Sequence, residues 1–217
     1  MTFLEKMTDE ELSHIKKLGY FLGSFDPMHL GHIEVIRIIL EKGLCDAVFV
    51  YCVQGKSSWK QRSDFFQRTK YCESMLCNIN NVILSYFPPQ KVQQKLTIKE
   101  GSKVKSKFSH ITGIIGADIA CDLEYKSNDP SIEALRRARQ SDFMQGIFLD
   151  KKFNDSIACS IALPATDFII ALRKDYKIED IPSTVCKRKV STIIDTKEYR
   201  YLSSSEIKRC VTNPNKL

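Results

Sequence analysis

Two short apolar segments, with a glycine-containing turn and a helical repeat between them, constrain the fold of this chain more than any other feature. Residues Leu18–Ser24 form an apolar run that ends beside a glycine, which is typical of a strand. Apolar residues then recur at helical spacing from Leu30 to Leu40, and Gly43 is suited to end that helix. The continuous apolar run Ala47–Val53 has the length of a buried parallel strand. These segments predict a strand–turn–helix–strand unit.

The same alternation of strand-like and helix-like segments continues to the C-terminus. Strands that alternate with helices predict an α/β fold with a mostly parallel sheet, in which ligands bind at the carboxyl ends of the strands. Helices are expected over 63–77, 117–123 and 203–211, and strands over 82–85, 110–116, 168–172 and 190–194. Three segments fit less well and are interpreted as an N-terminal extension (1–16), a polar, basic loop (88–109) and a possible insertion with a helix at 131–140 (126–164).

Charge and cysteine content narrow the classes of protein and partner. Lys and Arg exceed Asp and Glu by 33 to 26, a net charge of +7 that favours anionic partners but also suits a solubilising surface. None of the eight cysteines is spaced as in a zinc knuckle or a redox motif, and most lie in apolar segments, so we interpret them as small buried hydrophobic residues. We expect a cytoplasmic protein, because no signal-peptide core or membrane-length apolar run is present.

The ten residues Gly23–His32 carry the strongest functional signal in the sequence. They join the first predicted strand to the first predicted helix and read Gly-Ser-Phe-Asp-Pro-Met-His-Leu-Gly-His. His29 and His32 are three residues apart, so they share one face near the helix start. Backbone amides at a helix N-terminus attract anions, and glycines allow close approach of a ligand. The pattern predicts a cradle for polyphosphate; a metal site is the alternative, but no third ligand lies nearby in the sequence.

Two shorter motifs lie at the ends of other predicted elements. Ser203 and Ser204 open the last predicted helix, and with Lys208 they can hold and neutralise phosphate groups. Ser203 and Glu206 also match an S-x-x-E capping box, and the two roles are compatible. The triplet Gly116-Ala117-Asp118 follows a predicted strand, where an Asp can accept hydrogen bonds from ribose hydroxyls or cap the next helix.

The first motif resembles the G-x-F-D-P-x-H-x-G-H signature of the nucleotidyltransferases that carry the HIGH motif, and most closely that of the nicotinate and nicotinamide mononucleotide adenylyltransferases. Residues 201–209 are similar to this family's C-terminal I-S-S-T-x-I-R motif, with Lys208 where most members have Arg. Residues 116–118 resemble its G-x-D element, and 55–68 its basic loop with the helix that follows. The resemblance implies one Rossmann-like, doubly wound nucleotidyltransferase domain over residues 1–217.

The resemblance also implies a reaction and a set of site residues. ATP and nicotinate or nicotinamide mononucleotide would give the dinucleotide and pyrophosphate, with a Mg²⁺ ion held mainly by ATP oxygens. His29 and His32 are the expected catalytic residues. The expected ATP contacts are Gly23, Ser24, Phe25, Ser203, Ser204 and Lys208, and the expected ribose contacts are Gly116 and Asp118. The expected mononucleotide contacts are Lys56, Lys60, Arg68 and Tyr125, the last of which stands near the position of the family's ring-stacking Trp.

Other assignments remain open at this stage. A Ser-Ser-Ser segment with Lys also occurs in phosphopantetheine adenylyltransferases, so a different acceptor is the first alternative. Cytidylyltransferases share H-x-G-H but usually carry a different C-terminal motif. The missing Trp and Lys208 are compatible with an inactive nucleotide-binding regulator. The basic patches suggest RNA, but the aromatic, Gly-rich motifs of common RNA modules are absent. We expect ATP and a mononucleotide as ligands, no nucleic acid or membrane partner, and leave a homo-oligomer open.

Overall fold

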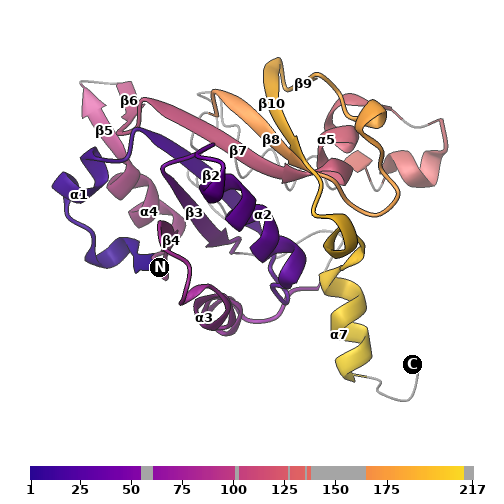
Figure 1. The fold of residues 1–217 in the computed structure, drawn as a ribbon, viewed down its shortest axis with the longest axis horizontal. Coiled ribbons are helices and arrows are strands. Elements are labelled where there is room, and N and C mark those ends of the chain that lie inside the picture. Colours follow the sequence, from indigo (N-terminus) through magenta and orange to yellow (C-terminus); the bar gives the residue numbers. More distant parts are fainter. Residues whose placement is uncertain (55–60, 101–102, 127, 135, 138–164, 213–217) are drawn as a thin grey trace.

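The computed structural model describes residues 1–54, 61–100, 103–126, 128–134, 136–137 and 165–212. The described strands form one eight-stranded sheet, in the order β1-β4-β3-β2-β7-β8-β10-β9, and a separate hairpin of β5 and β6 (Figure 1). Neighbouring strands of the large sheet are parallel, except that β9 runs antiparallel to β10. The strands are β1 (Thr2–Phe3), β2 (Lys17–Gly23), β3 (Ala47–Cys52), β4 (Val82–Leu84), β5 (Thr97–Glu100), β6 (Lys103–Ser106), β7 (His110–Gly116), β8 (Asp167–Ala171), β9 (Thr184–Val185) and β10 (Arg188–Ile194).

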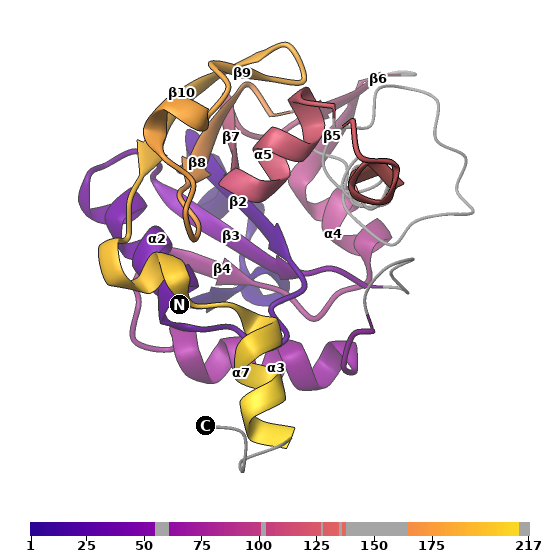
Figure 2. The same cartoon turned by 90° about the vertical axis from the view of Figure 1, so that its right-hand side faces the viewer.

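Helices cover both faces of the large sheet (Figures 1 and 2). They are α1 (Asp9–Ser13), α2 (Leu30–Glu41), α3 (Phe65–Leu76), α4 (Pro89–Leu96), α5 (Ala117–Glu124) and α7 (Ser204–Thr212), with short 3₁₀ helices η1 (Leu4–Lys6), η3 (Ile178–Asp180) and η4 (Lys197–Tyr201). Helices α2 and α3 share one buried core with Val50 of β3. Helices α1, α4 and α5 share the opposite core with Phe49 and Tyr51 of the same strand. Successive side chains of a strand point to opposite faces, so the doubly wound α/β fold expected from the sequence is confirmed.

The expectation of a loop over 88–109 is wrong, because this segment forms α4 and the β5–β6 hairpin. Pro89 lies in the first turn of α4, where a missing backbone N–H removes no helical hydrogen bond. Val92 and Leu96 are one turn apart and fully buried. Besides Pro89 they are the only apolar residues of this helix, and two such positions are too few to show a helical period in the sequence.

The residues before β2 belong to the sheet. The segment Thr2–Phe3 pairs in parallel with residues 83–84 of β4, so β1 is an edge strand. Leu4 and Leu12 are fully buried in the core on the α4 side. The segment interpreted as an extension therefore supplies a strand and part of the hydrophobic core.

Three remaining expectations concern the possible insertion, the cysteines and the membrane. Residues 130–134 and 136–137 are helical, in line with the helix expected at 131–140, and 138–164 lie outside the described residues. Cys45, Cys52 and Cys72 are buried as expected, whereas Cys77 is exposed. Within the described part of the chain, no helix has both the length and the apolar character needed to span a bilayer.

Candidate active site

A cavity of about 380 Å³ opens at the carboxyl ends of the central parallel strands. It is lined by Gly23 at the end of β2, Gly116 at the end of β7, Leu172 just after β8 and Thr196 just after β10. The N-terminus of α2 and the segment that leads into α7 complete the lining. Open parallel sheets bind their ligands in this crevice, so the position of the cavity agrees with the sequence motifs.

A buried aromatic side chain shapes the loop between β2 and α2. Phe25 has a left-handed backbone (φ 43°) and is 2% exposed. Its ring packs edge-on against Phe21 and His32, at centroid distances of 5.2 and 5.1 Å. A Cβ atom at Gly23 would lie 2.8 Å from this ring, so the packing requires glycine there. Gly23, Ser24 and Phe25 all line the cavity.

The two histidines of the first motif lie together on the cavity wall. His29 is the N-cap residue of α2 and is buried, and His32 is half-buried in the first turn. Their ring centroids are 3.7 Å apart with the planes inclined at 33°. The backbone N–H of His29 donates to Nδ1 of His32 over 3.2 Å, which fixes the orientation of the second ring. The structure thus brings together the pair that the sequence selected.

Helix α2 and η4 approach each other through their backbones. A Cβ atom at Gly31 would lie only 2.7 Å from the carbonyl oxygen of Tyr199. The glycine therefore lets the segment before α7 lie directly against the turn that carries His29. Both sides of this contact line the cavity, since Gly31, Tyr199 and Leu202 are all part of its wall.

The serine motif forms the second wall of the cavity. Ser203 caps α7, because its hydroxyl accepts a hydrogen bond from the backbone N–H of Glu206 over 3.2 Å. A side-chain hydrogen bond between Ser203 and the Glu206 carboxylate also lowers the pKa of that carboxyl. The hydroxyl of Ser204 donates to the carbonyl oxygen of Pro27 over 2.7 Å, so it ties α7 to the loop between β2 and α2. Residues 203–205 line the cavity.

Four cationic side chains of the described residues also line the cavity, and the sequence analysis assigned a role to none of them. They are Arg62, Arg173, Lys174 and Arg200. Arg173 and Lys174 directly follow the strand predicted over 168–172, so their position was a usable signal. Arg200 is fixed by hydrogen bonds to the carbonyl oxygens of Lys174 and Tyr176, over 2.7 and 3.1 Å.

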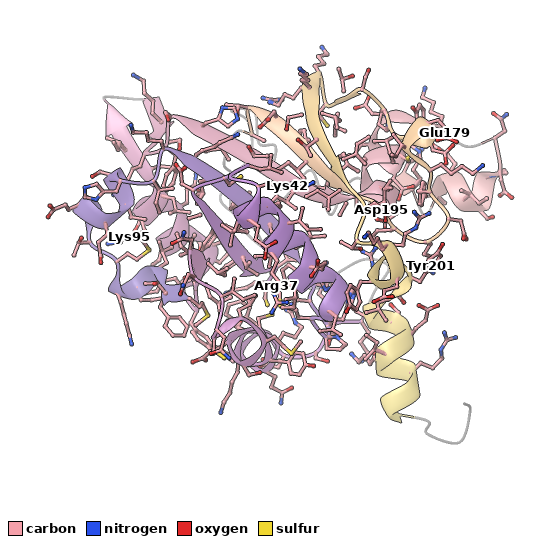
Figure 3. All side chains as sticks on the ribbon, viewed as in Figure 1. Arg37, Lys42, Lys95, Glu179, Asp195 and Tyr201 are labelled. Atoms are coloured by element: carbon pink, nitrogen blue, oxygen red, sulfur yellow. The ribbon has the colours of Figure 1, made fainter. Side chains whose placement is uncertain are left out.

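Arg200 also pairs with an acidic residue outside the cavity. Its guanidinium lies 3.3 Å from the carboxylate of Asp195, which sits between β10 and η4 (Figure 3). Arg62 is oriented in a similar way, since its Nε donates to the hydroxyl of Ser24 over 3.0 Å. These bonds preset two of the four cations in the ligand-free chain, which reduces the entropy lost when they contact an anion.

The triplet at the end of β7 places a carboxylate on the cavity. Asp118 lines it, and its Oδ1 atom is buried without a hydrogen-bond partner among the described residues. Gly116, not Asp118, is the N-cap of α5, so the capping alternative does not apply. A Cβ atom at Gly116 would collide with Oδ1 of Asp118 and lie 2.7 Å from Cδ of Arg173. A buried acceptor without a partner is costly, and a ligand hydroxyl would satisfy it.

Two expected ligand contacts instead hold the protein together. Lys208 does not line the cavity; its Nζ donates to Oδ2 of Asp26 over 3.0 Å and to the hydroxyl of Ser63 over 2.9 Å. Arg68 is 4% exposed and donates to the backbone carbonyls of residues 24, 53 and 63. Its guanidinium joins the chain just after β2 and β3 to Ser63, and its contact with the mononucleotide stays a prediction.

The remaining expected contacts are not part of the described cavity. Tyr125 is the C-cap residue of α5 and half-exposed, and it lies in a shallow groove with Cys121 and Glu179. This groove shares Lys174 and Tyr176 with the cavity wall, so Tyr125 lies next to the cavity but outside its lining. Lys56 and Lys60 lie outside the described residues, as does Trp59.

The arrangement is suited to bind a polyphosphate and a hydroxyl-bearing group side by side. Three helix N-termini, two imidazoles and four cations of the described residues face one cavity, and positive charge of this kind stabilises phosphate oxygens. A single carboxylate, that of Asp118, is the acidic side chain that the described residues contribute to the lining. The site therefore combines electrostatic stabilisation of anions with one strong hydrogen-bond acceptor.

Comparison with known proteins agrees with this description. A family model described as cytidylyltransferase-like matches residues 20–210. The fold is similar to that of Plasmodium falciparum nicotinic acid mononucleotide adenylyltransferase complexed with NaAD, with a TM-score of 0.55, 19% identity, and coverage of 93% of this chain and 86% of the other. The same enzyme complexed with APC gives a TM-score of 0.52, 17% identity and coverage of 93% and 87%. A sequence comparison with curated proteins gives no significant match.

Proposed function

Because this chain belongs to the cytidylyltransferase-like family of nucleotidyltransferases, we propose that it joins ATP to nicotinate or nicotinamide mononucleotide, with release of pyrophosphate. The observation that carries the proposal is the His29–His32 pair at the N-terminus of α2, which faces the cations around Arg173 across one cavity. The fold shared with an adenylyltransferase for nicotinic acid mononucleotide supports this choice of acceptor.

The reaction needs positioning and charge neutralisation more than proton transfer. A phosphate oxygen of the mononucleotide attacks the α-phosphorus of ATP, the new P–O bond forms, and the bond to the β-phosphate breaks so that pyrophosphate leaves. His29 and His32 contact the oxygens around the α-phosphorus, where negative charge accumulates in the transition state. Arg173, Lys174 and Arg200 hold the leaving phosphates in line.

Ribose binding is assigned to the end of β7. Oδ1 of Asp118 accepts a hydrogen bond from a ribose hydroxyl, which gives this buried atom the partner it lacks among the described residues. Gly116 keeps the space in front of the carboxylate open, because a Cβ atom there would occupy it. Lys56 and Lys60 are the proposed partners of the mononucleotide phosphate.

We propose that a Mg²⁺ ion accompanies ATP and would be held mainly by its phosphate oxygens. The described residues contain no group of three His, Cys, Asp or Glu side chains placed to hold a metal ion. Mg²⁺ retains several waters and is readily bound through substrate phosphates with few protein ligands. When bound it supplies further neutralisation of phosphate charge, and the protein's part is to hold those phosphates.

The proposal is tested by pyrophosphate release from purified protein with Mg²⁺ and a panel of substrates. ATP is paired in turn with nicotinate mononucleotide, nicotinamide mononucleotide and 4′-phosphopantetheine, and CTP replaces ATP in a parallel series. We expect turnover with ATP and at least one of the two mononucleotides. Faster turnover with 4′-phosphopantetheine would overturn the acceptor, faster turnover with CTP the nucleotide, and nucleotide binding without any turnover would indicate a regulator.

A further inference from the structure

Helix α7 is joined to the loop between β2 and α2 by polar contacts that span most of the chain. Lys208 donates to Asp26 over 3.0 Å, across a separation of 182 residues. One turn earlier, the Ser204 hydroxyl donates to the carbonyl oxygen of Pro27. Helix α7 otherwise extends away from the sheet (Figures 1 and 2). These contacts therefore fix the direction in which the helix leaves the site.

The acceptor in this pair is a buried carboxylate. Asp26 is 5% exposed, and its Oδ2 atom accepts hydrogen bonds from the Lys208 ammonium and from the backbone N–H of Ser63, the latter over 2.8 Å. Burial acts to raise the pKa of this carboxyl, but the bonds from Ser63 and Lys208 outweigh it, and the pKa lies below its ordinary value. A buried charge that loses such a partner is strongly destabilised.

The pair connects the two walls of the cavity. Asp26 lies in the segment 23–32 that carries His29, and Lys208 lies on the helix that residues 203–205 begin. Other cations bond to the same loop, since Arg62 donates to the Ser24 hydroxyl and Arg68 to the Ser24 carbonyl. Lys208 bonds to this loop from the C-terminal helix.

From this geometry we infer that Lys208 is a positioning residue: it latches α7 onto Asp26 and so sets the distance between the histidine wall and the serine wall. The inference rests on the proposed function for its catalytic consequence, but the latch itself exists without a nucleotide. A Lys that instead served as a phosphate ligand would have to leave Asp26 when ATP binds. The two roles therefore differ only once ATP is bound, and the ligand-free protein tests whether the contact with Asp26 holds the helix.

Hydrogen exchange of the ligand-free protein tests the latch directly. The variants are Lys208→Met, which removes the charge at similar length, Lys208→Arg, which keeps it, and Asp26→Asn; Arg209→Met is the matched control on the next, exposed position. We expect the backbone amides of residues 204–212 to exchange roughly tenfold faster in Lys208→Met and Asp26→Asn, since a charged hydrogen bond is lost. Lys208→Arg and the control should exchange like the parent protein.

Unchanged exchange in Lys208→Met would overturn the inference, whatever the activity of the protein. If Asp26→Asn fails to fold, the contrast between Lys208→Met and Lys208→Arg decides alone. Absence of turnover in the parent protein would overturn the proposed function and leave this result standing.

Steady-state kinetics then separate positioning from ligand binding. For a latch, Lys208→Met and Asp26→Asn each lower kcat about tenfold or more with little change in KM for ATP, because the walls are misplaced. The double variant should be no worse than the poorer single one, as expected for two groups that act as a unit. A phosphate ligand predicts the opposite: a raised KM for ATP in Lys208→Met, parent-like kinetics in Asp26→Asn, and additive losses.

Discussion

Replacing Gly31 by Ala should damage catalysis far more than stability. The new Cβ atom would lie 2.7 Å from the carbonyl oxygen of Tyr199, and ordinary contact begins at 3.4 Å, so the backbone of η4 must retreat by about 0.7 Å. Overpacking of this size costs about 1–3 kcal/mol, offset by up to ~1 kcal/mol from the better helix propensity of Ala. The net cost of at most about 3 kcal/mol should lower the melting temperature by no more than roughly 12 °C for a chain of this size.

The displaced wall carries Ser203, and the same Cβ atom lies 3.1 Å from Nδ1 of His29. A shift approaching 1 Å in a positioning element can cost about 10²-fold in rate, so we expect kcat to fall by that order. Pyrophosphate release and thermal unfolding on the same preparation measure the two effects. Gly43→Ala is the matched control: it strains a left-handed backbone (φ 61°) for a similar loss of stability, with nothing within 4 Å of the new atom. Equal turnover in the two variants would refute the reasoning.

Three other substitutions probe single contacts, and a fourth expectation concerns pH. His32→Ala should lower turnover by at least about 10²-fold while the protein stays folded, as for the loss of one preorganised donor; parent-like turnover would contradict its role. Ser204→Ala should cost about 1 kcal/mol of unfolding free energy through the lost bond to Pro27, measured by urea denaturation. Tyr125→Ala should leave both KM values within about twofold, because the ring lies off the cavity. Asp26→Asn should be less stable than the parent at neutral pH. The gap in unfolding free energy should narrow as pH falls from 3.8, where the unfolded chain binds the proton, through the lower folded-state pKa of Asp26; a constant gap would argue against the charged pair.

Long elements with a clear period were predictable from the sequence, and short polar ones were not. Helix α2 and strand β3 bury a regular set of apolar residues, so their limits follow from the pattern within a residue or two. Helix α4 buries only Val92 and Leu96 besides its Pro, and its stability comes from the core it meets. Strand β1 is two residues long, and its pairing with β4 depends on residues some 80 positions away. Neither element can therefore be recognised from the residues around it in the sequence.

The site residues likewise differ in whether their position could be predicted from nearby sequence. The histidine pair was predictable because a helix turn brings residues three apart together, a relation that is local in sequence. Arg68 and Lys208 were assigned to ligands from motif position alone, but the burial of Arg68 and the presence of Asp26 beside Lys208 depend on how distant segments pack. Arg200 was not selected, since its orientation is set by the backbone of residues 174 and 176.

A cation near a phosphate motif can therefore either face the ligand cavity or hold two parts of the protein together. The nearest buried carboxylate decides which of the two occurs. In the cavity, Arg173 lies beside Gly116, and the carboxylate there, Asp118, has an atom left over for a ligand. On α7, Lys208 meets a carboxylate that the Ser63 amide already binds, and the charge is used to hold the loop. An Arg at 208, as in most relatives of the motif, would present a planar fork that can serve Asp26 and a phosphate at once. The Lys has a compact ammonium instead, and in the ligand-free chain that ammonium is bonded to Asp26 and Ser63.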